Sequence, residues 1–423
     1  MSATNSVFMK EFRQNWRVLA VSFMCLLFAF SAPAFSLPFL FRSVIEEFGW
    51  TREQATLLAS AKYATGAVFS IVAGRFIDVI GVRKVLISVS ALGALAMVSF
   101  LWTPNLTIYY LSGVLLGIAS PGTIVAIKVL ISRTFHSSQG TAMGVAMLGT
   151  SVGSVIVPIA ITFLIGQYGW RVAIAMMSLG VWLIALPMMI FFLTDKSFEG
   201  SEPAAESAKP VSAAVTWGPV KALMKRREFW LIALAVFSAA FVDQAFVQHQ
   251  VLYLEVDLGM TAAFVAAGIS AMGLVGIAGR VFVGSIFDKL SSRGVSVMYL
   301  VLGASCLLAL AAFNPYIFAA FVVFRAVGHA AVLLDTTVLT KHTFGLANIG
   351  ILFGVYTAVV NIGFALGPWF MGRMFTVTGS YVTPFIICAG ISVFAAAILL
   401  PVKPKYWLEM KAKIKGQAAS ASA

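Results

Sequence analysis

Charged residues are scarce in this sequence. Only 11% of the 423 residues are Asp, Glu, Lys or Arg, whereas soluble globular domains carry about 25%. With 60% hydrophobic residues and a mean hydropathy of +0.96, no compact shape could hide the apolar surface from water. A soluble globular protein is therefore excluded. We assign the net charge of +13 to loops at a membrane surface rather than to nucleic-acid binding.

The residue patterns of catalytic and metal sites are also missing. The three cysteines, Cys25, Cys306 and Cys388, lie in separate apolar runs and form neither a metal spacing nor a disulfide framework. The sequence contains no nucleophile–base set, no paired catalytic carboxylates and no phosphate-binding loop. It therefore predicts no enzyme activity, no metal and no cofactor, and it disfavours a membrane enzyme or a receptor.

Long apolar runs make up most of the chain. A helix needs about 20 apolar residues to cross a bilayer, and about twelve runs approach that length. Backbone groups in lipid must be paired within the segment, so we predict an all-α membrane protein. The first six spans are 18–41, 54–77, 85–102, 106–131, 141–165 and 172–193; the second six are 229–251, 262–287, 295–313, 316–339, 349–374 and 382–400.

One polar stretch divides these spans into two sets. The predicted organisation is an N-terminal six-helix half (1–194), a linker (195–228), a C-terminal six-helix half (229–402) and a basic tail (403–423). Lys and Arg collect in the linker, in the tail and in alternate loops, which places both termini in the cytoplasm. We expect a functional monomer in a cell (inner) membrane.

A short polar segment occurs twice, and we predict a loop for each copy. Gly74 and Asp78 of the first copy are followed 210 residues later by Gly284 and Asp288. The same offset relates further glycines and prolines, namely Gly49 and Gly259, Gly140 and Gly350, Gly144 and Gly354, Gly153 and Gly363, Pro158 and Pro368, and Gly169 and Gly379. Duplication of a set of spans is typical of transporters, with parallel repeats about an axis along the membrane normal.

The first polar segment resembles the signature between helices two and three of the major facilitator superfamily, through Gly74, Asp78, Gly81, Arg83 and Lys84. Three further segments resemble its monocarboxylate-porter and oxalate/formate-antiporter branch. These are Phe48-Gly-Trp-Thr-Arg-Glu53, Arg133-Thr-Phe with Gly140-Thr-Ala-Met-Gly144, and Tyr168-Gly-Trp-Arg-Val-Ala173. The resemblance implies a major facilitator fold of two six-helix halves and alternating-access transport of a small organic anion.

The same resemblance assigns a substrate residue. An arginine in helix eight binds the substrate carboxylate in this branch, and Arg280 has that place. Gly276 stands where animal monocarboxylate carriers have a proton-carrying aspartate, and helix one lacks their lysine around Phe35. The proton relay of those carriers therefore cannot be transferred unchanged.

Charged residues inside the spans call for a reason, because hydrocarbon disfavours them by several kcal/mol. Arg280 is the main candidate for binding a carboxylate bidentately, and snorkelling to the inner interface is the alternative. Lys62, near mid-membrane, either adds charge to an anion site or forms a structural pair. Lys128 either supports the substrate site or snorkels. Tyr63 and Asn361 are further substrate-binding candidates.

Four residues are candidates for proton coupling or gating. Asp243 is predicted at mid-depth, as a proton site or as a partner for Lys62. Arg325 and His329 lie one turn apart, and His329 either titrates near neutrality or makes an ordinary helix contact. Asp335 lies near the inner end of its helix.

Two further predictions concern helix ends. Lys128 and Asp335 lie near the inner ends of equivalent helices, so a pair between them would close the inner side. His249 is predicted at the outer interface, near the end of its span.

The preferred function is secondary active transport of a small organic anion, a monocarboxylate in the first instance, coupled to protons. The excess of cations within the spans favours an anion over a cationic drug. Two alternatives stay open: an anion exchanger of the oxalate/formate type, and an efflux pump for apolar compounds, for which 35 Phe and 17 Met would suit an apolar cavity.

Overall fold

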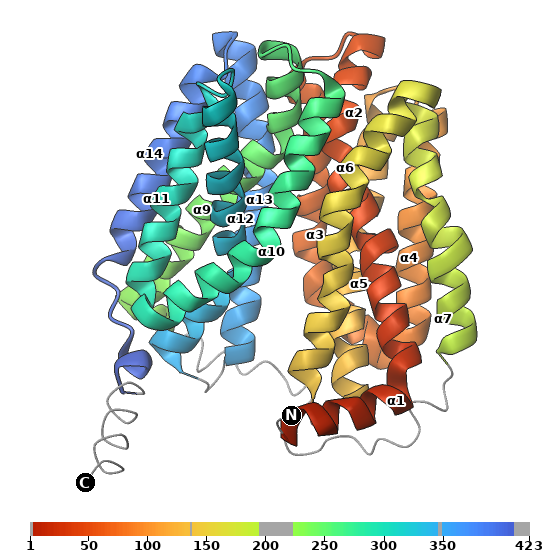
Figure 1. Ribbon diagram of the computed structural model, residues 1–423, viewed down its shortest axis with the longest axis vertical. Helices are drawn as coiled ribbons and strands as arrows, with labels where there is room; N and C mark the ends of the chain where they lie inside the picture. The colour runs from red at the N-terminus through yellow and green to blue at the C-terminus, as the bar shows by residue number, and fades with distance from the viewer. Residues whose placement is uncertain (1–2, 136–137, 194–222, 346–348, 410–423) are drawn as a thin grey trace. The chain divides into compact units, whose positions relative to one another are not determined.

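The computed structural model describes residues 3–135, 138–193, 223–345 and 349–409, and within these every regular element is helical (Figure 1). The elements up to residue 193 are α1 (Ala3–Met24), η1 (Cys25–Ser31), α2 (Ala32–Phe48), α3 (Arg52–Ile80), α4 (Val82–Ser99), η2 (Phe100–Trp102), α5 (Leu106–Thr134), α6 (Gln139–Met177), η3 (Val181–Ala185) and α7 (Leu186–Phe192). The later elements are α9 (Arg227–Leu252), η5 (Tyr253–Asp257), α10 (Ala262–Leu290), α11 (Ser292–Ala309), α12 (Pro315–Phe344), α13 (Ile349–Thr378) and α14 (Val382–Leu399). Most of the predicted linker and the end of the predicted tail lie outside the described residues.

The described helices account for the predicted crossings. Ten stretches are long and apolar enough to cross a membrane. One of them, Gln139–Phe192, is 54 residues long and bends at Gly169, so it supplies two of the predicted spans. A further helix, α3, has 29 residues and carries Lys62 in its interior. An all-helical membrane protein is therefore confirmed, whereas the count of twelve spans stays a prediction.

The described residues form two compact units. Unit 1 comprises Met1–Ala214 with Gln248–Leu274, and unit 2 comprises Val215–Val247 with Val275–Ala423. In unit 1, α5 packs along both α3 and α4; in unit 2, α11 packs along both α12 and α14. The halves predicted from the sequence assign residues 248–274 differently and stay a prediction.

Small residues allow helices to approach closely in unit 1. A Cβ atom on Gly117 of α5 would lie 2.3 Å from the backbone oxygen of Lys62 on α3. No side chain fits there, so the close packing of α3 on α5 requires glycine. Lys62 is thereby fixed at the α3–α5 contact.

Backbone geometry repeats at the offset found in the sequence. Gly49 and Gly259 both have φ of +66°, and Gly169 and Gly379 have φ of +75° and +67°. These left-handed conformations favour glycine, because it lacks a Cβ atom. The matching glycines therefore correspond to matching helix junctions.

The prediction that the duplicated polar segment is a loop is wrong. Helix α3 continues to Ile80, a single residue, Gly81, interrupts it with φ of +92°, and α4 begins at Val82. The second copy is likewise helical to the end of α10 at Leu290. No residue before Gly81 breaks the helix, so Arg75 and Asp78 lie in the last two turns of α3, whereas Arg83 and Lys84 lie in the first turn of α4.

Candidate functional site

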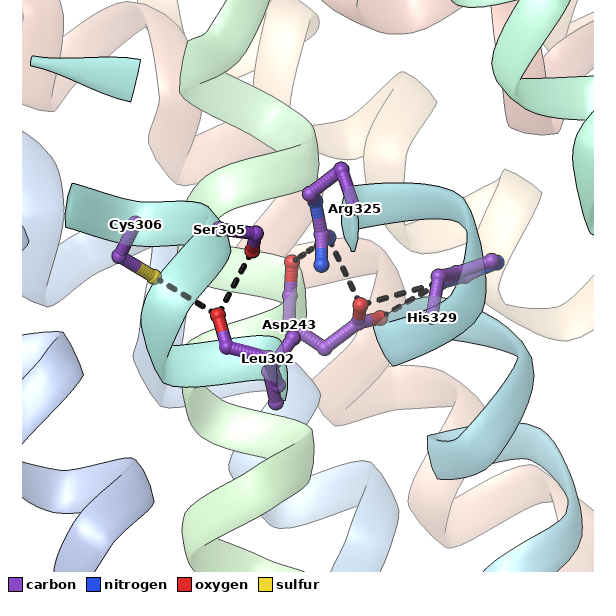
Figure 2. Close-up of polar contacts among 6 residues, drawn as sticks. All are labelled: Asp243, Leu302, Ser305, Cys306, Arg325 and His329. Carbon is purple, nitrogen blue, oxygen red and sulfur yellow. Dashed lines mark hydrogen bonds and ion pairs between the residues drawn. The ribbon is translucent and has the colours of Figure 1, made fainter. Parts of the chain in front are cut away.

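Three polar residues of unit 2 form one buried cluster, which we call the polar triad: Asp243 on α9 with Arg325 and His329 on α12 (Figure 2). Arg325 Nη2 donates to Asp243 Oδ1 at 2.7 Å and to its backbone oxygen at 2.9 Å. His329 Nδ1 lies 3.0 and 2.9 Å from Asp243 Oδ1 and Oδ2. The structure therefore brings together three of the four residues predicted for proton coupling or gating.

Burial differs sharply within the polar triad. The side chain of Asp243 is fully buried and that of Arg325 is 2% exposed, whereas that of His329 is 33% exposed. The guanidinium of Arg325 lies over the ring of Phe246, with Cζ 5.3 Å from the ring centroid. This cation–π contact partly compensates for Arg325 Nε and Nη1, which have no hydrogen-bond partner among the described residues.

Helix α11 packs beside the polar triad without adding a charge to it. Ser305 Oγ and Cys306 Sγ both donate to the backbone oxygen of Leu302, at 2.6 and 3.5 Å (Figure 2). Both side chains are therefore bonded within α11. The triad consists of one carboxylate, one guanidinium and one imidazole, which can hold a charge pair and exchange one proton.

Asp335 lies elsewhere on α12 and has different partners. Tyr299 on α11 donates its hydroxyl to Asp335 Oδ2 at 2.6 Å, and Thr336 donates through its hydroxyl and its backbone N–H to Oδ1. Within the described residues of unit 2, no cationic nitrogen lies within 4.0 Å of this buried carboxyl. The predicted Lys128–Asp335 pair joins residues of different units and stays a prediction; Lys128 itself is exposed.

Lys62 is a buried cation in the interior of α3. It is 4% exposed, and its Nζ lies 5.2 Å from the ring centroid of Tyr63. Within the described residues of unit 1, no carboxylate oxygen lies within 4.0 Å of it. The structural pair considered from the sequence is therefore not found in unit 1.

The remaining predicted substrate residues lie in unit 2. Arg280 is half-buried on α10, in the interior of the helix between Gly279 and the signature copy that ends it. Asn361 is half-buried on α13. Tyr356 on the same helix donates its hydroxyl to the backbone oxygen of Phe229 at 3.1 Å, so it holds α13 against α9.

The signature residues hold helix ends together. Asp78 Oδ1 lies 3.5 Å from Arg133 Nη2 on α5, and Arg83 donates to the backbone oxygen of Ile190 at 2.9 Å. Lys84 is exposed. In the second copy, Asp288 is exposed and its backbone oxygen accepts from Trp407 Nε1 at 2.9 Å.

Two of the branch-like segments contact each other. Trp170 and Arg171 both donate to the carboxylate of Glu47, the residue before Phe48, and the guanidinium of Arg171 lies 5.2 Å from the ring of Phe48. Phe48 in turn stacks on Trp50 at 4.2 Å. These residues join the end of α2 to the bend of α6 at Gly169, so their role in unit 1 is structural.

Sequence reasoning missed one residue. Nothing in the sequence indicates that Tyr299 bonds Asp335, because a tyrosine in an apolar run has no distinguishing pattern. His249 is fully buried, and the helix extends beyond the predicted span, through η5 to Asp257. The interfacial position of His249 stays a prediction. Among the described residues, no three His, Cys, Asp or Glu side chains form a cluster that could hold a metal ion.

Comparisons with known proteins agree with this architecture. The crystal structure of a bacterial homologue of the human lysosomal transporter Spinster matches with a TM-score of 0.70 at 16% identity, covering 95% of this chain and 97% of its own. At that identity the likeness shows the fold alone. The chain is 25% identical to the "Probable sulfoacetate transporter" of Cupriavidus necator, over 85% of this chain and 87% of that protein. It is 23% identical to monocarboxylate transporter 13 of Rattus norvegicus, over 76% of this chain and 73% of that protein.

The model of one family matches most of the chain. Residues 19–334 fit the Major Facilitator Superfamily, and this range includes the signature, its second copy and the polar triad. The chain therefore belongs to the Major Facilitator Superfamily and is a multi-pass membrane transporter rather than an enzyme.

Proposed function

We propose that this chain is a secondary active transporter that moves a small organic anion, a monocarboxylate in the first instance, together with protons. The observation that carries the proposal is Lys62, a buried cation in a membrane helix without a carboxylate partner among the described residues of its unit. An uncompensated cation in hydrocarbon is expensive. An anionic substrate would compensate it.

Two further observations support the choice of an anion. Arg280 places a permanent positive charge within α10, where it is half-buried. The names of the relatives refer to sulfoacetate and monocarboxylates, both of which are organic anions. Lys128, Tyr63 and Asn361 are the additional residues that we assign to substrate binding.

The proposal also covers coupling and orientation. We assign proton coupling or gating to the polar triad and to Asp335, and the closing of the inner side to a Lys128–Asp335 pair. The distribution of Lys and Arg between the loops supports a cell (inner) membrane location with both termini in the cytoplasm. The transporter would act as a monomer.

Uptake into proteoliposomes tests the proposal. Labelled lactate, pyruvate, oxalate and an aromatic acid are offered with and without an inward proton gradient to wild type, Arg280→Ala and Lys62→Met. Arg293→Ala is the matched control, because Arg293 is exposed at the start of α11. A charge-assisted hydrogen bond contributes about 1.5–3 kcal/mol, so uptake should fall about 10- to 100-fold in Arg280→Ala and stay unchanged in the control.

The other outcomes are distinct. If Arg280→Ala moves the best acid as fast as wild type, the assignment of the substrate carboxylate to Arg280 is lost. Uptake that ignores the gradient and requires an internal anion indicates an exchanger. If none of the acids is transported but an apolar compound is, the protein is an efflux pump.

A further inference from the structure

The proton coupling proposed above still lacks a specific proton carrier, and the geometry of the polar triad selects one. Asp243 is unsuited to that task in the observed arrangement. Its Oδ1 receives a hydrogen bond of 2.7 Å from Arg325, whose guanidinium stays charged at any relevant pH. Protonating Asp243 would leave the buried guanidinium without its counter-charge, which costs about 3–5 kcal/mol. Arg325 therefore keeps Asp243 ionised.

The contact with Asp243 also decides the tautomer of His329. Both Asp243 oxygens near His329 Nδ1 are acceptors, at 3.0 and 2.9 Å, so Nδ1 must carry a hydrogen. In the neutral imidazole the free lone pair is then on Nε2. Adding a proton there produces an imidazolium and changes the net charge of the polar triad from zero to one positive charge, since Asp243 and Arg325 cancel each other.

Access favours His329 as well. It is the one member of the polar triad with an exposed part, at 33% of its side chain. His329 lies one turn after Arg325 and therefore on the same side of α12. Of the exposed apolar residues on α12, Tyr316 and Val323 lie on the opposite side, and Leu333 lies one turn after His329.

The other titratable groups near the triad in unit 2 are already engaged. On α12 itself, Asp335 accepts from Tyr299 of α11. On α11, Cys306 donates to Leu302, and on α13, Tyr356 donates to Phe229. The remaining charged groups of these four helices are near helix ends, namely Arg227, Glu228, His249, Arg293, Lys341, His342 and Arg373. Helix α10 also packs against α12 beside His329, because a Cβ atom on Gly279 would lie 3.8 Å from Val327 and 3.9 Å from Ala330, and Arg280 follows Gly279. Asp243 is the charged group that bonds His329, and Arg325 is the cation that bonds Asp243.

We propose that His329 is the proton-carrying residue of this transporter, loading and releasing the proton at Nε2, with Asp243 as the residue that positions its ring and Arg325 as the cation that keeps Asp243 ionised. The inference rests on the proposed function, because it assumes that protons accompany the anion. One proton enters from water on one side and leaves to water on the other. In the loaded state, the positive charge of the triad offsets the negative charge of the substrate.

The variant His329→Gln tests this in proteoliposomes. Glutamine can donate an amide N–H to Asp243 but cannot take up a proton at neutral pH. Exchange of labelled for unlabelled acid without a gradient needs no net proton movement, so it should fall less than accumulation does. Accumulation driven by an inward proton gradient should be lost. His342→Gln, on the same helix and bonded to Ser291, is the matched control and should still accumulate the acid.

Asp335→Asn tests the alternative that Asp335 carries the proton. If Asp335→Asn abolishes accumulation while His329→Gln retains it, the carrier is Asp335 and the inference is overturned. Accumulation by His329→Gln at the wild-type level overturns it as well. Loss of accumulation confined to His329→Gln supports it.

A second measurement needs no substrate, so it tests the role of His329 independently of which anion is transported. Deuterium exchange at imidazole C2–H, followed by mass spectrometry of the purified protein, reports the protonation of each histidine. The exchange rate at His329 should depend on pH in wild type and in Asp243→Glu, which keeps the carboxylate, and this dependence should change in Asp243→Asn. An exchange rate at His329 that does not depend on pH overturns the inference, even if transport of an acid has been shown.

Discussion

The two repeats of this chain share their backbone but not their buried charges. At the shared offset of 210 residues, Pro33, Leu115 and Ala119 of the first repeat correspond to Asp243, Arg325 and His329 of the second. The first repeat has no charge or titratable group at any of these positions. Yet the helix junctions match, as the paired glycines with positive φ demonstrate.

The difference also runs in the other direction. Lys62 of the first repeat corresponds to Met272, and Arg280 of the second corresponds to Ser70. None of these buried or half-buried charges is therefore required by the repeated architecture. Features shared by the two repeats are explained by packing and helix ends, whereas features confined to one repeat are candidates for transport. This is why the polar triad, rather than the duplicated signature, is the place to look for coupling.

The largest expected effect comes from making position 243 apolar, as position 33 is. Asp243→Ala leaves Arg325 buried without its counter-charge, so the free energy of unfolding should fall by about 3–5 kcal/mol. Unfolding in a denaturing-detergent titration, followed by the loss of helical signal, measures it.

The double variant Asp243→Ala with Arg325→Leu sharpens the result, since leucine occupies the equivalent position 115. Replacing both charges by apolar groups removes the unpaired cation, so the double variant should be more stable than Asp243→Ala alone. If the stability losses of the two substitutions simply add, Asp243 and Arg325 are not coupled. The comparison between the repeats would then not explain the stability of the buried pair.

The fold could be predicted from the sequence more completely than the site. Spans follow from length and hydropathy, and the repeat follows from a fixed offset, because both depend on properties of the linear chain. The helical state of Gly74–Ile80 was missed, since charged residues between two apolar runs suggest a loop although nothing among them breaks a helix. The helix that carries His249 likewise continues beyond the apolar run, to Asp257.

The partners of the buried charges depend on side-chain positions in different helices. Arg325 and His329 could be paired from sequence, as they lie one turn apart, but their common contact with Asp243 on α9 could not. The bond between Asp335 and Tyr299 likewise depends on how α11 packs on α12. The substrate assignments of Arg280, Lys62, Lys128, Tyr63 and Asn361 stay predictions.

A second prediction tests whether equivalent glycines have equivalent roles. A Cβ atom on Gly153 would lie 2.3 Å from Ser31 Cβ, and one on Gly363 would lie 2.7 Å from the backbone oxygen of Phe237. Alanine at either position overfills a tight helix contact, so each variant should lose about 1–3 kcal/mol of stability. Gly144→Ala and Gly354→Ala are the matched controls, because a Cβ atom there meets nothing within 4 Å.

The same detergent titration compares all four variants. Both controls should stay within about 0.5 kcal/mol of wild type, since alanine also suits a helix better than glycine. Stability lost in one repeat only would contradict the equivalence of these helix contacts.

The smallest expected effect concerns a junction at which the repeats differ in residue type. Gly81 has φ of +92°, and the equivalent Ser291 has φ of +52°, the only positive value for a non-glycine among the described residues. Gly81→Ala should cost about 1–3 kcal/mol through backbone strain.

Ser291 tolerates its conformation with help from a hydrogen bond of 2.9 Å between its Oγ and His342 Nδ1. Ser291→Ala should therefore lose about 1 kcal/mol, whereas Ser291→Gly, which loses the bond but relieves the strain, should stay close to wild type. If Ser291→Gly is as unstable as Ser291→Ala, the hydrogen bond rather than the backbone determines this junction, and the two repeats end their second helices for different physical reasons.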